Sequence, residues 1–111
     1  MTQTPVNLFV AQYAPSSNTN MYVSPTSTTT IIDKFTANNT SGSGVALSVY
    51  IVPNGGTAGA SNLVYISTIG ANTFLDITGL QDQILAPGDS IYVLAGTGSA
   101  IVVRGSGRQG K

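Results

Sequence analysis

The sequence contains no cysteine, no histidine and no tryptophan, and its four acidic residues are all aspartates. Without cysteine the chain can form neither a disulfide nor a thiolate metal site, and without histidine the common pairs of nucleophile and base are missing. The aspartates show neither a carboxylate-pair spacing nor an EF-hand-like array. We therefore expect no enzymatic activity, no cofactor and no bound metal.

Charge is scarce as well, since only 7% of the residues are charged and the formal net charge is zero. A balanced chain gains little from displacing phosphate counterions, so we expect no nucleic-acid partner. The longest aliphatic runs, such as residues 49–52, are far shorter than the roughly 20 residues that span a bilayer. The first ten residues lack the basic and apolar regions of a secretory signal. These features predict a soluble protein that is made in a cytoplasm and has no membrane partner.

Polarity comes instead from uncharged side chains, including 14 threonines, 12 serines and 8 asparagines. Such a neutral surface suits a protein that is docked against a partner, because a neutral free monomer tends to associate. The alternative is that the serine and threonine hydroxyls simply solvate the surface well. Composition alone leaves both interpretations open.

Short runs rich in Val, Ile, Thr, Tyr and Phe alternate with clusters of Gly, Pro, Asn and Ser, which is typical of an all-β sandwich or barrel. The pattern predicts eight strands, at residues 6–13, 19–23, 29–38, 44–52, 61–67, 73–77, 88–95 and 99–105. Eight short antiparallel strands favour a jelly-roll-like β-sandwich, with another Greek-key sandwich as the alternative. We expect one domain over residues 1–111, with a flexible N-terminal arm at about 1–5 and a flexible C-terminal tail at about 106–111.

Jelly-roll pairing would place the second, seventh, fourth and fifth predicted strands side by side in one sheet. Each of these strands contains one tyrosine, and the residues on either side of it are apolar and lie at the alternate positions expected to face the core. The four tyrosines are Tyr22, Tyr92, Tyr50 and Tyr65. All four rings would then form a stripe on the outer face of that sheet, where tyrosine favours contact with a partner. The alternatives are ordinary cross-strand aromatic pairing, or a register that turns some of the rings inward.

The third predicted strand breaks strict alternation at the adjacent residues Ile31 and Ile32. This predicts either burial on both faces or a β-bulge. Asp33 and Lys34 follow directly and would point to opposite faces. Charges at such positions favour an edge or near-edge strand that is protected against further pairing.

Residues 105–111 match G-x-x-x-x-G-K, the opening of a phosphate-binding loop. A working loop of this kind continues with Ser or Thr and opens a helix, and neither follows here. We therefore interpret the segment as a mildly basic tail rather than as a nucleotide site.

The two ends of the chain hold further candidate contact residues. Leu8 and Phe9 lie close to the predicted N-terminal arm, while Arg104, Arg108 and Lys111 lie at the other end. These side chains could reach a partner, and the cationic ones an acidic partner. The alternative is that both ends are unconstrained tails.

Three stretches, "IIDKFTANNTSGSGVALSVYIVPNGGTAGASNLV" (31–64), "QILAPGDSIYVLA" (83–95) and "IVVRGSGR" (101–108), together resemble the capsid decoration proteins of short-tailed double-stranded-DNA bacteriophages. These are also called cement or staple proteins, and the resemblance covers about two-thirds of the chain. It implies a non-enzymatic protein of the virion, made in the bacterial host cytoplasm, that stabilises the capsid from outside. The implied partners are the major capsid protein and further copies of the chain, as a homodimer or homotrimer. A carbohydrate- or receptor-binding sandwich and a tail or neck component are the alternatives.

Overall fold

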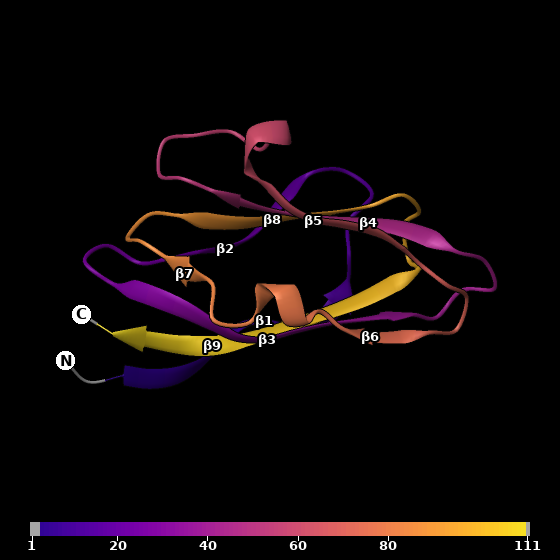
Figure 1. The fold of residues 1–111 in the computed structure, drawn as a ribbon, viewed down its shortest axis with the longest axis horizontal. Coiled ribbons are helices and arrows are strands. Elements are labelled where there is room, and N and C mark those ends of the chain that lie inside the picture. The colour runs from indigo at the N-terminus through magenta and orange to yellow at the C-terminus, as the bar shows by residue number, and fades with distance from the viewer. Residues whose placement is uncertain (1–2, 111) are drawn as a thin grey trace.

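The computed structural model describes residues 3–110 and shows two antiparallel β-sheets that pack face to face (Figure 1). The strands are β1 (Gln3–Tyr13), β2 (Thr19–Val23), β3 (Thr29–Asn39), β4 (Val45–Val52), β5 (Leu63–Ile69), β6 (Phe74–Asp76), β7 (Ile84–Leu85), β8 (Ser90–Ala95) and β9 (Ile101–Gly110). Two short 3₁₀ helices, η1 (Ala60–Asn62) and η2 (Thr78–Leu80), lie within the connections. No helix in this part of the chain is long and apolar enough to cross a membrane.

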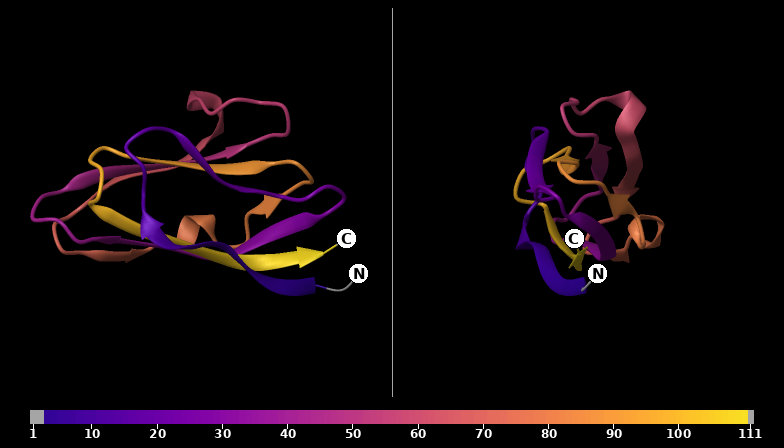
Figure 2. Two further views of the ribbon diagram at one scale, coloured as in Figure 1. Left: turned by 180° about the vertical axis from the view of Figure 1, so that it is seen from behind. Right: turned by 90° about the vertical axis from the view of Figure 1, so that its left-hand side faces the viewer.

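The strand order confirms the predicted jelly roll. One sheet has the order β1-β9-β3-β6, with β7 also pairing with β3, and the other has the order β2-β8-β4-β5. The second sheet contains the same four segments that sequence reasoning placed side by side. All eight predicted strands are present, and the two-residue strand β7 is an addition. In the end-on view of Figure 2, the indigo β1 lies on one side of the sandwich, and the segments that contain β5, β6 and β7 lie on the other.

Alternating aliphatic residues on facing strands build the core. In β4, Val45, Leu47 and Val49 are all at most 3% exposed. Phe9 of β1 packs edge-to-face against Phe35 of β3, with ring centroids 5.4 Å apart. Burial of each large apolar side chain stabilises the fold by about 1.5–3 kcal/mol relative to its exposure. The apolar layer between the two sheets therefore provides most of the stability.

Strand β3 carries the predicted bulge but is not an edge strand. Its register with β9 shifts between Ile32 and Lys34, so that the extra residue is Asp33. The strand lies between β9 on one side and the short edge strands β6 and β7 on the other, so it has the near-edge position that the sequence predicted as one alternative. The two charges have a different role, because each forms an ion pair with a neighbouring strand.

Both expected arms are strands over the described residues. Strand β1 already begins at Gln3, and β9 continues through Ser106 to Gly110, paired with β1 and β3 at once. The glycines of β9 that suggested a flexible tail have a packing role. A Cβ atom on Gly107 would lie 2.2 Å from the carbonyl oxygen of Ile31, and one on Gly105 would lie 2.8 Å from the Phe9 ring. The glycine-rich pattern therefore reflects close approach between strands, which only glycine permits.

The turn before β8 has the chemistry expected for Pro-Gly-Asp. Gly88 adopts a φ of +86°, a left-handed conformation that favours glycine. Asp89 accepts hydrogen bonds from the backbone N–H of Ala86 and from that of Asn54, each at 3.0 Å. Its side chain thus closes the turn locally and ties it to the loop that follows β4, which is typical of aspartate in turns.

Candidate interaction surfaces

Two of the four predicted tyrosines lie together on the outer face of the β2-β8-β4-β5 sheet. Tyr50 of β4 and Tyr92 of β8 are directly opposite residues in the antiparallel ladder, and both are half-buried. The neighbouring pair on the same face is Ser48 and Leu94. The four strands of this sheet contain no charged residue. The outer face is therefore neutral, with a cross-strand aromatic pair at its centre.

Tyr22 faces the interior, so the expectation that it belongs to the outer stripe is wrong. The register between β2 and β8 shifts between Asn20 and Tyr22, which places Tyr22 opposite the fully buried Ile91. Its hydroxyl lies 2.9 Å from the buried Thr30 Oγ1 and accepts a hydrogen bond from the Gln109 side-chain amide. A bulge has reversed the parity of this position, and the ring joins the two sheets across the core.

Tyr65 also departs from the predicted stripe. It lies opposite Val49, which is 1% exposed, and it packs against the core. Val64 and Ile66, which the prediction placed inside, are 43% and 64% exposed. Because β5 is an edge strand, an inward tyrosine can bury its ring at the rim of the core. The outer-face prediction therefore holds for Tyr50 and Tyr92 alone.

Leu8 and Phe9 are core residues rather than contacts on a mobile arm. Each is 5% exposed, and the ladder between β1 and β9 shifts register between Asn7 and Phe9. This irregularity turns two consecutive apolar side chains towards the core. Neither residue is available to a partner in the folded protein.

Arg104 and Arg108 lie on the outer face of the β1-β9-β3-β6 sheet, opposite to the tyrosine pair. Arg104 donates a hydrogen bond to Asn7 Oδ1 at 3.1 Å, and Arg108 donates one to Asp33 Oδ1 at 2.9 Å. Lys111 lies outside the described residues. The predicted contact residues therefore do not form one surface, because the rings and the arginines lie on opposite faces of the molecule.

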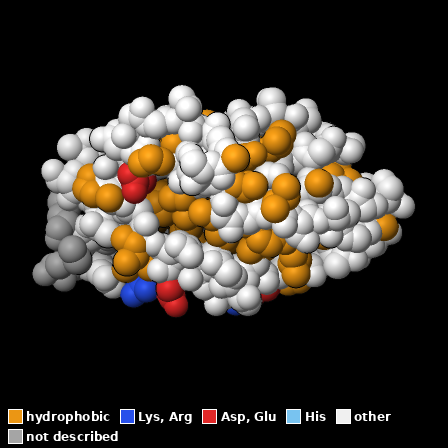
Figure 3. Space-filling model, turned by 45° about the horizontal axis from the view of Figure 1, so that its top comes forward, with side chains coloured by type: hydrophobic (Ala, Val, Ile, Leu, Met, Phe, Trp, Pro, Cys, Tyr) orange, Lys and Arg blue, Asp and Glu red, His pale blue; other side chains and the backbone are white. Residues whose placement is uncertain are grey.

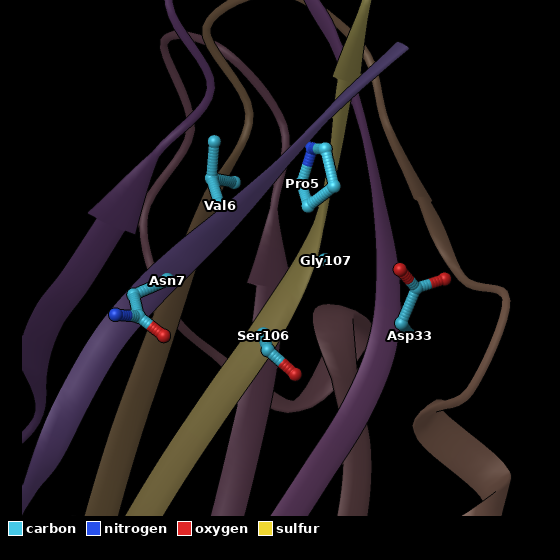
Figure 4. Close-up of a pocket in the computed structure, with 6 residues that line it drawn as sticks. All are labelled: Pro5, Val6, Asn7, Asp33, Ser106 and Gly107. Atoms are coloured by element: carbon cyan, nitrogen blue, oxygen red, sulfur yellow. The ribbon is translucent and has the colours of Figure 1, made fainter.

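A shallow hollow of about 350 Å³ lies beside these arginines on the same sheet. Figure 4 shows it between Asn7 of β1 and Asp33 of β3, with Ser106 of β9 between them. Gly107 and the bulged residue Asp33 also line this space. Because Arg108 already binds the Asp33 carboxylate, the hollow offers hydrogen-bonding groups rather than a free charge.

The aspartates of the described residues have separate local environments. Asp33 pairs with Arg108, Asp76 pairs with Lys34 at 2.8 Å, and Asp89 closes its turn. Within residues 3–110, no three acidic or other metal-ligating side chains come together in a group that could hold an ion. Asp33, Asp76 and Asp89 thus each have a local structural partner.

All of the large exposed apolar side chains in the described part of the chain lie on edge strands. They are Val10 and Tyr13 on β1, Val23 on β2, Val64 and Ile66 on β5, Phe74 on β6 and Ile84 on β7. In Figure 3, hydrophobic side chains form a band along the length of the molecule, and the few charged groups lie mainly at its margins.

No protein-family model and no curated protein match this chain. Among solved structures, it is similar to the D431N mutant VP2 protein of infectious bursal disease virus in T=1 particles, with 13% identity and a TM-score of 0.49. It is also similar to the VP2 subviral particle of that virus, with 11% identity and a TM-score of 0.46. The chain is covered to 97% in both comparisons but spans only about a third of each VP2 chain, 31% and 32%. Similarities this weak identify neither a family nor an activity.

Proposed function

We propose that this protein is a capsid decoration protein, which binds the outer surface of an assembled bacteriophage capsid and bridges subunits of the major capsid protein. The observation that supports the proposal is the neutral outer face of the β2-β8-β4-β5 sheet, where Tyr50 and Tyr92 lie opposite each other. We infer that this face meets the shell, which gives the protein a location on the outside of the virion.

The physical argument concerns what each face of the sandwich can bind. Tyrosine buries a large ring at low entropic cost and keeps a hydroxyl for hydrogen bonding, so paired tyrosines suit a partly wet contact. The opposite sheet has its described cations engaged by Asp33, Asp76 and Asn7. A neutral face also meets no like-charge repulsion from a shell. Several copies of such a modest contact, held by one oligomer, would give strong net attachment through effective concentration.

The test is to mix purified protein with capsids that lack it and to count the bound copies. The proposal predicts saturable binding in a fixed ratio to capsid subunits. Tyr50→Ala and Tyr92→Ala should weaken attachment at least tenfold while lowering the melting temperature little. Tyr13→Ala is the matched control, because Tyr13 is 50% exposed on β1 of the other sheet. Absence of binding, or equal losses of attachment and stability in both tyrosine variants, would refute the proposal.

A carbohydrate- or receptor-binding module is the second candidate, and the same tyrosine pair favours it because aromatic rings can stack on sugars. The chain has no tryptophan, the usual stacking platform. Glycan-array binding that Tyr50→Ala abolishes, together with no attachment to capsids, would select this function. Binding to purified tails or necks instead of capsids would indicate a tail or neck component.

A further inference from the structure

We infer that the free edge of β5 pairs antiparallel with the β5 edge of a second copy of this chain, which joins the two β2-β8-β4-β5 sheets into one continuous sheet. The inference gives the homo-oligomer of the proposed function a contact surface. The inference depends on the proposed function only for the biological role of the dimer, because the evidence for the contact comes from β5 itself.

The edge of β5 is open to a further strand. The strand is last in its sheet, with β4 as its only neighbour. Among residues 3–110, the only hydrogen bond that reaches its backbone from outside β4 comes from the Asn39 side chain, which donates to the Ile69 carbonyl oxygen at 2.8 Å. An edge of this kind presents unpaired N–H and C=O groups, which is a template for pairing.

The sequence of β5 carries none of the features that protect an edge strand. Leu63–Ile69 reads LVYISTI, which contains no charged residue and no proline. Its one register shift lies near its start, beside Val64, so that the run from Tyr65 onward is regular. β-branched and aromatic residues dominate the strand and favour extended pairing.

The other edges are less suited to pairing. Strand β1 contains Pro5, which has no N–H to donate, and two register shifts. Strand β2 has five residues and a bulge, while β6 and β7 have three and two residues. A ladder of useful length and regularity is therefore available on β5 alone among the described edges.

The chemistry of β5 fits a copy of itself. In an antiparallel pair with full overlap, the middle residue, Ile66, lies opposite Ile66 of the second copy across a two-fold axis. Ile66 is 64% exposed, and this pairing would cover it with an identical apolar side chain. Because the strand is neutral, self-pairing brings no like charges together, which would be destabilising in a ladder of charged residues. A two-fold contact of this kind is closed, so it gives a dimer rather than a fibre.

Single-cysteine variants test the contact directly, because the chain has no cysteine of its own. Opposite residues in an antiparallel ladder have Cα atoms about 4.5–5.5 Å apart, within the range of disulfides. Under mild oxidation, Ile66→Cys should therefore form a disulfide-linked dimer. Val10→Cys is the matched control, with 62% exposure of the native side chain on the opposite side of the sandwich. Equal cross-linking of the two variants, or efficient mixed cross-linking between them, would overturn the inference.

A second measurement does not depend on oxidation. Light scattering of the purified protein, without capsids, should give a dimer, and Ile66→Lys should convert it to a monomer with an unchanged circular-dichroism spectrum. Val10→Lys should leave the dimer intact. A monomeric native protein, or a dimer that survives Ile66→Lys, would overturn the inference. Since no shell is present, these outcomes are independent of whether the protein attaches to capsids.

Discussion

Replacement of Gly107 by alanine would test the close approach of β9 to β3 on which the first sheet depends. A Cβ atom at this position would lie 2.2 Å from the Ile31 carbonyl oxygen, 3.2 Å from its carbonyl carbon and 3.4 Å from the Ile32 Cα atom. Real Cβ contacts do not fall below 3.0 Å, so the methyl group and the oxygen must separate by about 0.8 Å. The obstacle is backbone within a hydrogen-bonded ladder, which cannot rotate away as a side chain would.

The expected loss of stability is large for the addition of one methyl group. Overpacking costs about 1–3 kcal/mol, and a clash with backbone belongs at the upper end of that range. For a domain of this size, each kcal/mol corresponds to a fall in melting temperature of about 4 °C, so Gly107→Ala should melt about 12 °C lower than the native protein. Strand β9 is paired on both sides at this point, with Val6 of β1 and Ile32 of β3. The strain therefore affects two ladders.

Thermal unfolding followed by circular dichroism measures this loss, and urea unfolding gives the free energy. Gly42→Ala is the matched control, because a Cβ atom at Gly42 would have nothing within 4 Å. Its melting temperature should stay within about 2 °C of the native value, as for other surface substitutions. If Gly107→Ala melts together with this control, the two strands do not approach as closely as described, and the packing explanation for the glycines of β9 fails.

Three further substitutions test particular contacts. Phe9→Ala should lower the free energy of unfolding, measured in urea, by about 3–5 kcal/mol, as for other buried phenylalanines. A loss below about 1 kcal/mol would contradict the burial of Phe9 and indicate a position on a surface arm. Tyr22→Phe should cost about 1–3 kcal/mol, because the hydroxyl bonded to Thr30 joins the sheets, and unchanged stability would place that hydroxyl in solvent. Lys34→Ala should cost at most about 1 kcal/mol, because the Lys34 side chain is 58% exposed in its ion pair with Asp76, and a greater loss would show a structural role for the pair.

The sequence predicts the fold well in strands whose large apolar residues mainly occupy alternate positions. In β4, the large aliphatic residues Val45, Leu47 and Val49 alternate with the smaller Ala46 and Ser48, which predicts the inward face. The spacing of such strands between Gly- and Pro-containing turns was enough to predict the two-sheet architecture and the β2-β8-β4-β5 grouping. Hydrophobic alternation fixes which face is buried, and few topologies can join eight antiparallel strands of this length.

Parity is ambiguous where successive residues are all apolar. In β5, Val64, Tyr65 and Ile66 allow either face to be buried, and the register with β4 decides in favour of Tyr65. In β2, the bulge before Tyr22 reverses the expected face, and nothing local in the sequence marks it. The outward direction of the tyrosines was therefore predicted correctly for the central pair of strands and incorrectly for the two edge strands, where irregular pairing is common.

The glycine-rich end of the sequence predicts a flexible tail, but its described residues belong to β9, and the reason is related. Glycine indicates flexibility when only local conformational freedom is considered, but Gly105 and Gly107 are needed where another strand or an aromatic ring comes too close for a side chain. That requirement depends on partners nearly a hundred residues away, such as Phe9. Sequence reasoning without the fold cannot identify such partners.

The position of β9 has a consequence for how the molecule is made. This strand is the last in the jelly roll, yet it lies in the middle of its sheet, where β1 has no other strand to pair with. During synthesis, β1 therefore cannot pair until β9 has emerged from the ribosome. The native sandwich forms only after translation of all nine strands, and the nascent chain exposes its apolar residues to chaperones until then.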